Sequence, residues 1–238
     1  MAPREFDPAE PELMDRPQPA SRELEVDLEN LHQINRHFGG LRLWRKFLRR
    51  WLQPGGRYSV LDLCTGGADF PRLAVDWARR HDVTLEVIAV DFQPGSVEIA
   101  RRWCAGYPEI TVREADARDF AASESFDFVF CSLALHHFSE ADAVRILQRC
   151  RSLARRAALV ADLERGPLAS VGVWLLTALL YREPMTRIDA RLSVRRAFSF
   201  AEYAELARRA GWEHFGHARF ALARQAVWWE TGVELPSG

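Results

Sequence analysis

The stretch that decides the fold is VLDLCTGGADFPRLA, residues 60–74. An apolar run leads into two adjacent glycines, and the residues after the glycines have the composition of a helix. A strand that turns directly into a helix is the first unit of a parallel α/β sheet. In such sheets the ligand lies at the carboxyl ends of the strands, where helix amino termini point, so this turn is a candidate binding site.

The carboxylates beside this turn discriminate between classes of ligand. Asp62 precedes the turn and Asp69 follows it. A dinucleotide would need G-x-G-x-x-G around its pyrophosphate, and Cys64 and Phe70 break that pattern. A P-loop needs a lysine after its second glycine, but the only lysine, Lys46, lies upstream. S-adenosylmethionine has no phosphate and carries a sulfonium and an ammonium, which carboxylates attract.

Short apolar runs alternate with helical patterns after residue 56. The predicted strands are residues 58–63, 84–90, 110–113, 126–132 and 157–162, and the predicted helices between them are 70–80, 95–105 and 140–153. Two more strands are expected within residues 212–230. This alternation predicts an α/β fold, a doubly wound, Rossmann-like, mostly parallel sheet of seven strands with helices on both faces.

The segments outside this alternation define the predicted domain organisation. Residues 1–20 contain five prolines and several acids, so they bury little apolar surface and are predicted to be a flexible tail. A single domain is expected over residues 21–238, with N-terminal helices in 21–53, a cofactor-binding core in 57–165 and a helical insertion on the substrate side in 166–198. The most apolar part of that insertion, PLASVGVWLLTALLY, is too short to span a bilayer comfortably and is predicted to be a buried or lid helix.

Composition and charge narrow the function further. The chain has 238 residues and a formal net charge of −1, which gives no general attraction for nucleic acid or an anionic membrane as the main partner. Its four cysteines form no CxxC pair, which argues against a zinc cluster or a disulfide framework, and no metal is expected. The opening residues lack the basic start and apolar run of a signal peptide, so a cytoplasmic location is predicted.

The turn after residue 62 resembles motif I of class I S-adenosylmethionine-dependent methyltransferases, commonly D-x-G-x-G-x-G. Asp62 occupies the acidic position, and Cys64, Gly66 and Ala68 occupy the glycine positions, with Thr65 between them. Two of the three glycines are therefore replaced by small residues, which permit close approach but not every backbone angle. The resemblance implies that these residues surround the cofactor.

Three later segments are similar to further signatures of that family, in the family's order. AVDFQP places Asp91 where an acid accepts the ribose hydroxyls, with Phe92 beside the adenine. EADARDF places Asp116 at the adenine amino group, with Ala117 as a backbone contact. FDFVFCSLALHHF resembles motif IV, and the implied cofactor contacts there are Cys131, Ser132 and Leu133.

The resemblance extends upstream of the first strand. INRHFGGLRLWRKF is similar to the N-x-x-x-x-G-x-x-R-x-W segment of ubiquinone and menaquinone C-methyltransferases. The matching positions are Asn35, Gly39 or Gly40, Arg42 and Trp44. In enzymes of this kind the leading helices close over the cofactor. The likeness covers roughly residues 30–162.

Methyl transfer is an in-line displacement with a neutral leaving group, so the protein mainly has to align donor and acceptor. A histidine beside the acceptor is able to take a proton from a phenol or enol near neutral pH. His136 and His137 follow the fourth predicted strand and are the candidate catalytic residues, although loop histidines often only satisfy backbone groups. Leu135, Trp174 and Tyr181 are predicted to line an apolar acceptor pocket.

The sequence therefore predicts an enzyme, an S-adenosylmethionine-dependent methyltransferase for a small, largely apolar acceptor. An aromatic or polyketide-like molecule of secondary metabolism is expected, with oxygen as the favoured target. Two alternatives stay open. One is carbon methylation of a quinone precursor, and the other is a non-catalytic partner protein that binds the cofactor and has no acceptor pocket. Neither nucleic acid nor a membrane span is expected, and the oligomeric state is not predicted.

Overall fold

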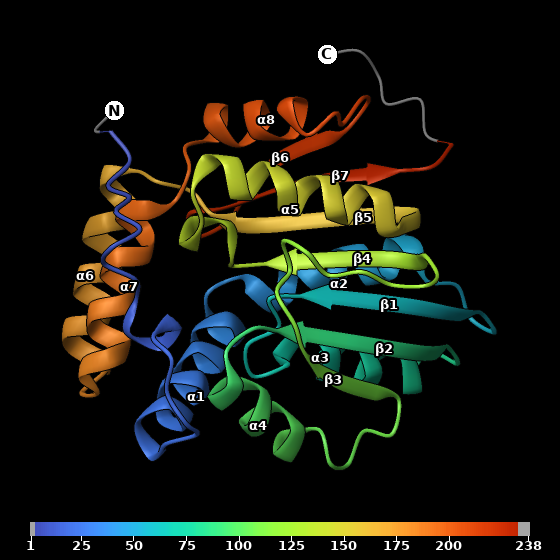
Figure 1. The fold of residues 1–238 in the computed structure, drawn as a ribbon, viewed down its shortest axis with the longest axis horizontal. Helices are drawn as coiled ribbons and strands as arrows, with labels where there is room; N and C mark the ends of the chain where they lie inside the picture. The colour runs from blue at the N-terminus through green and yellow to red at the C-terminus, as the bar shows by residue number, and fades with distance from the viewer. Residues whose placement is uncertain (1–2, 233–238) are drawn as a thin grey trace.

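The computed structural model describes residues 3–232 and contains one central sheet (Figure 1). The strands are β1 (Arg57–Leu63), β2 (Thr84–Asp91), β3 (Ile110–Glu114), β4 (Phe126–Ser132), β5 (Ala154–Leu163), β6 (Gly216–Phe220) and β7 (Arg224–Glu230). Their order is β3-β2-β1-β4-β5-β7-β6. Strands β1 to β5 are parallel, and β7 is antiparallel to both of its neighbours. The predicted seven-stranded, mostly parallel sheet is confirmed within the described residues.

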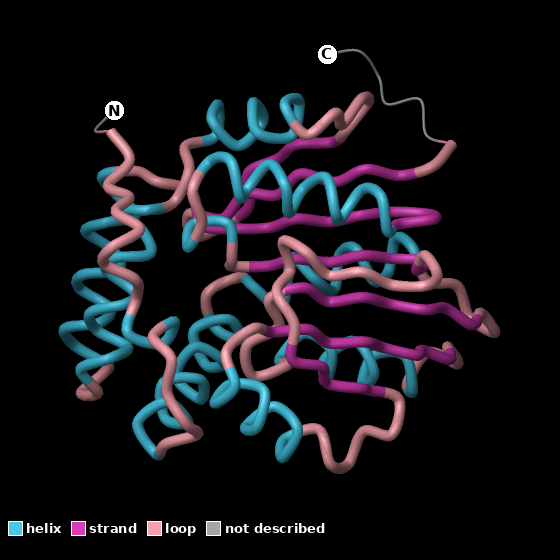
Figure 2. Tube along the Cα trace, viewed as in Figure 1, coloured by secondary structure: helices cyan, strands magenta, loops and turns pink. Residues whose placement is uncertain are grey.

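Helices cover both faces of this sheet (Figure 2). They are α1 (Arg22–His37), α2 (Gly40–Trp51), α3 (Asp69–Arg79), α4 (Pro94–Trp103), α5 (Glu140–Leu153), α6 (Pro167–Leu180), α7 (Pro184–Arg196) and α8 (Phe200–Arg209), with 3₁₀ turns η1 (Leu13–Asp15) and η2 (Leu135–His137). Alternate strand residues enter opposite cores: Val60 packs with α2, α3 and α4, whereas Leu61 packs with α5 and α8. Because successive strand residues point to opposite faces, the same strands contribute to the hydrophobic cores on both sides of the sheet.

The carboxyl ends of the parallel strands are covered by a third group of helices. Figure 1 shows α1, α6 and α7 at that end, with the N-terminal segment running beside them. The insertion after β5 consists of two helices, and Pro184 is the first residue of α7, where its fixed backbone angle suits a helix start. Among residues 3–232, no helix combines the length and the apolar character needed to cross a bilayer.

Trp44 anchors helix α2 against one face of the sheet. Its ring stacks on Phe70 and Phe130 with centroid distances of 4.4 and 4.2 Å, and its Nε1 donates to Ser132 Oγ at 2.9 Å. The tryptophan of the upstream signature thus links α2 to the end of β4. Arg42 of the same signature is exposed and contributes to a basic surface of α2.

The N-terminal segment lies against the strand ends in the structure. The backbone N–H groups of Leu13 and Met14 both donate to the Asp189 carboxylate at 2.9 Å. The guanidinium of Arg4 donates to the carbonyl oxygen of His136 at 3.1 Å. The sequence predicted a flexible tail because residues 1–20 have few apolar side chains to bury. The contacts seen in the structure are instead hydrogen bonds and ion pairs, which that reasoning did not consider. How far the segment moves in solution stays a prediction.

Candidate active site

The turn between β1 and α3 holds three residues in the left-handed backbone region. Cys64, Gly66 and Ala68 have φ of 58, 54 and 57°. These are the three positions at which motif I carries glycine, and the conformation costs a residue with a side chain roughly 1–2 kcal/mol. A Cβ on Gly66 would meet only Leu28, at 3.8 Å, so backbone angle rather than crowding favours glycine there. The replaced glycines therefore preserve the shape of the turn at a cost in strain.

Two carboxylates hold this turn from behind. Asp91, the last residue of β2, accepts the Gly66 N–H at 2.8 Å and the Gln93 N–H at 3.0 Å. Asp62 accepts the Thr65 hydroxyl at 2.6 Å. Burial raises the pKa of Asp91, and burial with the nearby Asp91 charge raises the pKa of Asp62 to about 7. A cation bound at this turn would relieve that concentration of negative charge, whereas a pyrophosphate would increase it.

The same cavity continues past the end of β2 toward β3. Phe92 stands at its edge with 43 % of its surface exposed, and Ala117 is buried in its wall. Asp116 is paired with Arg118 at 2.5 Å, and that hydrogen bond holds the pKa of Asp116 below its usual value. The three residues therefore line the same cavity, and their contacts with the adenine stay predictions.

Most of the predicted cofactor residues line one cavity of about 460 Å³, a size typical of small-molecule sites. Those in its wall are Cys64, Thr65, Gly66, Asp91, Phe92, Asp116, Ala117, Ser132 and Leu133. Asp62, Ala68 and Cys131 lie behind the wall and are buried, so they act on its shape through neighbours. Direct cofactor contacts of individual residues stay predictions.

His136 is held by a buried carboxylate at the end of β5. Its Nδ1 lies 2.6 Å from Asp162 Oδ1, and its backbone N–H donates to Oδ2 at 3.0 Å. Burial alone would raise the pKa of Asp162, but His136 and the surrounding hydrogen bonds hold it below the usual value. An ionised carboxylate on Nδ1 favours the tautomer with its proton there, which leaves Nε2 as an acceptor. His136 lines the cavity, so a proton acceptor is available to a bound molecule.

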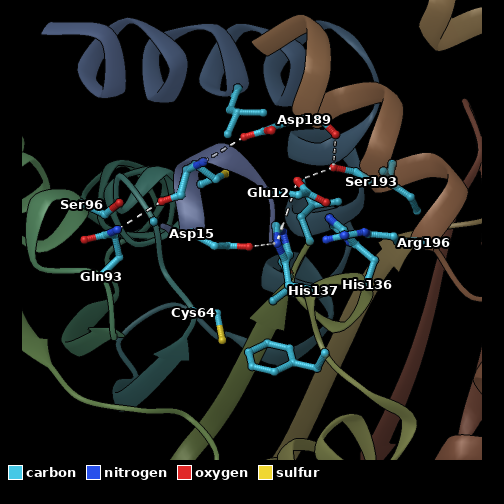
Figure 3. A pocket seen from close by; sticks show the side chains of 18 of the residues that line it. Glu12, Asp15, Cys64, Gln93, Ser96, His136, His137, Asp189, Ser193 and Arg196 are labelled. Atoms are coloured by element: carbon cyan, nitrogen blue, oxygen red, sulfur yellow. Dashed lines mark hydrogen bonds and ion pairs between the residues drawn. The ribbon is translucent and has the colours of Figure 1, made fainter. Parts of the chain in front are cut away.

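His137 has a different environment, created by the N-terminal segment. Its Nδ1 lies 2.5 Å from Asp15 and 3.9 Å from Glu12 (Figure 3). Burial lowers the pKa of His137, but the two carboxylates outweigh burial and hold it well above the usual value. The two carboxylates therefore favour the protonated form of His137, which makes it a weaker candidate for a base than His136.

The acceptor end of the cavity differs from the prediction. Leu135 is fully buried in the core beside α5, and neither Trp174 nor Tyr181 belongs to the cavity wall. The apolar wall is formed instead by Phe6, Leu31, Val173, Leu176 and Val194. The cause is rotation: α6 turns Val173 and Leu176 inward, and Trp174 therefore faces outward.

Several residues of the site were missed by the sequence reasoning. Asp162, which is buried behind the cavity wall and holds His136, could have been found, because it ends a predicted strand as Asp62 and Asp91 do. The others are Glu12, Asp15, Asp27, Asp189, Ser193 and Arg196, which come from the N-terminal segment, α1 and α7. No local signal marks them. Burial raises the pKa of Asp27 to about 7 and that of Asp189 to about 6, and neighbouring carboxylates such as Glu12 add to both shifts.

One group in the cavity has the composition of a metal site. Glu12, His136 and His137 present possible ligand atoms within 4.8 Å of one another. A metal requires neutral histidine ligands, whereas the pairing of His137 with Asp15 favours the protonated form of His137. That pairing would compete with a metal ion for His137.

Residues 60–157 match a family model described as a methyltransferase domain. Demethylmenaquinone methyltransferase of Clavibacter sepedonicus is 34% identical over 104 residues, 43% of this chain and 40% of that protein. 2-Phytyl-1,4-naphtoquinone methyltransferase of Thermosynechococcus vestitus is 34% identical over 80 residues, 34% of each chain. The matches thus span less than half of either curated relative. The structure of human N-acetylserotonin methyltransferase with S-adenosylmethionine has a TM-score of 0.63 at 15% identity, covering 89% of this chain and 56% of that one.

Proposed function

Because this chain carries a class I S-adenosylmethionine-dependent methyltransferase domain, we propose that it methylates a small, largely apolar acceptor at a hydroxyl oxygen. The observation that supports this most is the continuity of one cavity from Asp91, at the cofactor turn, to His136. A donor and an acceptor bound at its two ends would be held in contact, and such orientation supplies up to about 7–11 kcal/mol in favourable cases.

The residues of the cofactor turn suit S-adenosylmethionine. Asp62 and Asp91 supply negative charge, and the left-handed backbone at Gly66 opens the turn to a ligand. When bound, the cofactor supplies a methyl group on a sulfonium, and its leaving group is a neutral thioether. Asp91 would accept the ribose hydroxyls while Asp62 orients Thr65 at the methionyl end.

His136 is the proposed base. Its Nε2 would accept the hydroxyl proton of the acceptor, and the oxygen would form its bond to the methyl carbon as the carbon–sulfur bond breaks. Asp162 stabilises the resulting imidazolium from the other side of the ring. His137 is proposed to orient rather than to deprotonate, because its carboxylate partners favour its protonated form.

The acceptor class follows from the wall at the other end. Phe6, Val173 and Leu176 provide apolar surface, and the carboxylates of Glu12 and Asp27 repel an anionic molecule. An uncharged aromatic or polyketide-like phenol, of the kind made in secondary metabolism, satisfies both conditions.

Carbon methylation of a quinone precursor is the second candidate, favoured by the likeness to demethylmenaquinone methyltransferase over 104 residues. The His136–Asp162 pair serves it equally well, because carbon methylation of a phenol also begins with loss of the hydroxyl proton. The position of the new methyl group distinguishes the two reactions. The third hypothesis, a non-catalytic binding protein, predicts no acceptor pocket, and the extension of the cavity beyond the cofactor turn to His136 argues against it.

The test is methyl transfer from labelled S-adenosylmethionine to a panel of apolar phenols, enols and hydroquinones. Mass spectrometry would detect the added methyl, and carbon–proton NMR would assign it to oxygen or carbon. His136→Gln should abolish turnover and keep affinity for S-adenosylhomocysteine. Cofactor binding with no product from any acceptor would contradict the proposal and favour the non-catalytic hypothesis.

We also propose that residues 3–20, the described part of the predicted tail, are a flexible segment that closes the acceptor end. Their contacts reach the cavity through Asp15 and Arg4, and the η1 amides depend on one carboxylate, Asp189. Amide hydrogen exchange should show residues 3–20 opening faster than α1, and slower in the presence of a bound phenol. Protection equal to that of α1 in the free protein would contradict a flexible segment.

A further inference from the structure

Helix α6 is uncharged, yet nine of its residues are exposed. Of its 14 residues only Thr177 is buried. Its large apolar side chains outside the cavity include Leu168 at 88 %, Leu179 at 78 % and Trp174 at 54 % exposure. A helix that is apolar all round is normally buried in a core or a bilayer. An apolar surface of this kind on a soluble fold marks an interaction site.

The two sides of α6 face different environments. Val173, Leu176 and Thr177 lie at helical spacing and line the cavity. Leu168, Val171, Trp174, Leu175 and Leu179 recur at intervals of three to four residues and are exposed. The helix is therefore a wall one helix thick between the acceptor cavity and the surroundings, and Figure 1 shows it at the outer edge of the molecule.

The residues that follow α6 carry more positive than negative charge. Arg182 is exposed just after the helix, and Arg187 and Arg191 lie half-buried on α7. Arg191 donates to Thr177 Oγ1 and its guanidinium lies 5.4 Å from the Trp174 ring centre. The acids among residues 181–191 are Glu183, which caps α7, and Asp189, which is buried. The net charge of −1 concerns the whole chain, whereas this edge is locally basic.

The exposed side of α6 alone is small for a stable dimer. A helix of 14 residues is about 21 Å long and about 10 Å wide. A stable complex uses about 20–30 residues of each partner, and one side of α6 supplies fewer than its 14 residues. The same dimensions suit a helix lying in the interface of a bilayer, where the apolar side enters by about 5–10 Å and basic residues contact the headgroups.

We propose that α6 binds the surface of an anionic lipid bilayer and admits lipid-dissolved acceptors to the cavity behind it. Leu168, Leu175 and Leu179 enter the acyl boundary, and Arg182 and Arg187 meet the lipid phosphates. The benefit of this contact for the enzyme rests on the proposed function. An apolar phenol concentrates in lipid, so a bilayer-bound enzyme would meet its acceptor there. The contact itself does not require methyl transfer, so it is tested without an acceptor.

The experiment is sedimentation of the full chain with vesicles of phosphatidylcholine, with and without about a third phosphatidylglycerol. We expect binding to the mixed vesicles and several-fold weaker binding to the neutral ones. Leu168→Glu/Leu179→Glu should weaken binding by at least tenfold. Both positions are exposed, so folding should be retained. Brominated acyl chains should quench tryptophan emission in the wild type and less in Trp174→Phe.

The matched control is Thr84→Glu/Ala105→Glu, which adds the same charge at exposed positions on β2 and after α4. This variant should bind vesicles as the wild type does. Three results would overturn the proposal: no binding of the wild type, equal loss in the control, or a dimer in sedimentation velocity that Leu168→Glu/Leu179→Glu dissociates. Vesicle binding without methyl transfer would leave the bilayer contact intact and count against the proposed function alone.

Discussion

Replacing Asp162 with asparagine alters the one carboxylate that faces His136. In the wild-type chain the His136 Nδ1 lies 2.6 Å from Oδ1, and the backbone N–H donates to Oδ2 at 3.0 Å. With its oxygen toward the His136 backbone N–H, the asparagine presents an amide N–H to Nδ1, and the Leu163 N–H, which donates to Oδ1 at 2.7 Å in the wild type, loses its acceptor. The ring proton then moves to Nε2, the atom that should accept the proton of the acceptor. Asp162→Asn therefore removes the base while keeping its shape.

Loss of a general base lowers a rate by about 10²–10⁴-fold. That range equals about 2.7–5.5 kcal/mol of activation free energy, at about 1.36 kcal/mol for each tenfold step. We expect single-turnover methyl transfer to a phenol to slow by this factor. Calorimetric affinity for S-adenosylhomocysteine should be unchanged, because Asp91 lies on a different strand. Asp15→Asn makes the same chemical change beside His137 and should slow the reaction far less, since His137 is the weaker candidate for a base.

An acceptor that is already ionised distinguishes a base from a residue that only positions the acceptor. With a phenol ionised at the assay pH, Asp162→Asn should lose less than tenfold in rate. The reasoning is refuted by equal losses for ionised and un-ionised phenols, or by a loss below threefold for the un-ionised one. Denaturant unfolding would verify that the variant is folded, since Asp162 is fully buried.

Three further predictions concern the cofactor turn and pH. Asp91→Ala should weaken S-adenosylhomocysteine binding by about 100-fold in calorimetry, because two hydrogen bonds to a charged group are lost. Unchanged affinity would refute the ribose assignment. Between pH 5 and 8 the free energy of unfolding of the unliganded protein should fall. The pKa of Asp62 is about 7 in the folded chain and lower in the unfolded chain, so the folded state holds a proton that the unfolded state has already lost. This contribution to stability disappears as the pH rises through about 7. The raised pKa of His137 acts in the same direction above about 6.5. Chemical denaturation that shows rising stability over this range would contradict both assignments. Ala68→Gly should change stability by less than about 1 kcal/mol, since relief of its φ of 57° offsets the lost methyl burial, whereas Ala68→Val should cost more than about 2 kcal/mol. A thermal melt in which Ala68→Gly is the more damaging of the two would show that strain is absent.

The sequence by itself determined the sheet, the cofactor turn and the carboxylates at the strand ends. These features depend on local patterns: the two-residue period of β1 and β2, the glycines at 66 and 67, and an acid where a strand stops. Strand ends of a parallel sheet meet at one edge, so Asp62 and Asp91 could be placed together without coordinates. Even the replaced glycines were identifiable, and their positive φ confirms that the turn keeps its shape.

Only the tertiary structure decided what surrounds the acceptor. His136 and Asp162 are 26 residues apart, and His137 and Asp15 are 122 apart, so no local pattern connects them. The two histidines look alike in sequence, and only the structure shows that His136 pairs with Asp162 of β5 and His137 with Asp15 of the N-terminal segment. The sequence of α6 predicted an apolar helix, but only the structure shows which side faces the cavity: Val173 lines it, and Trp174 faces outward. Contacts between distant segments set such rotations and pairings, because the free energy that fixes them comes from packing rather than from the local chain.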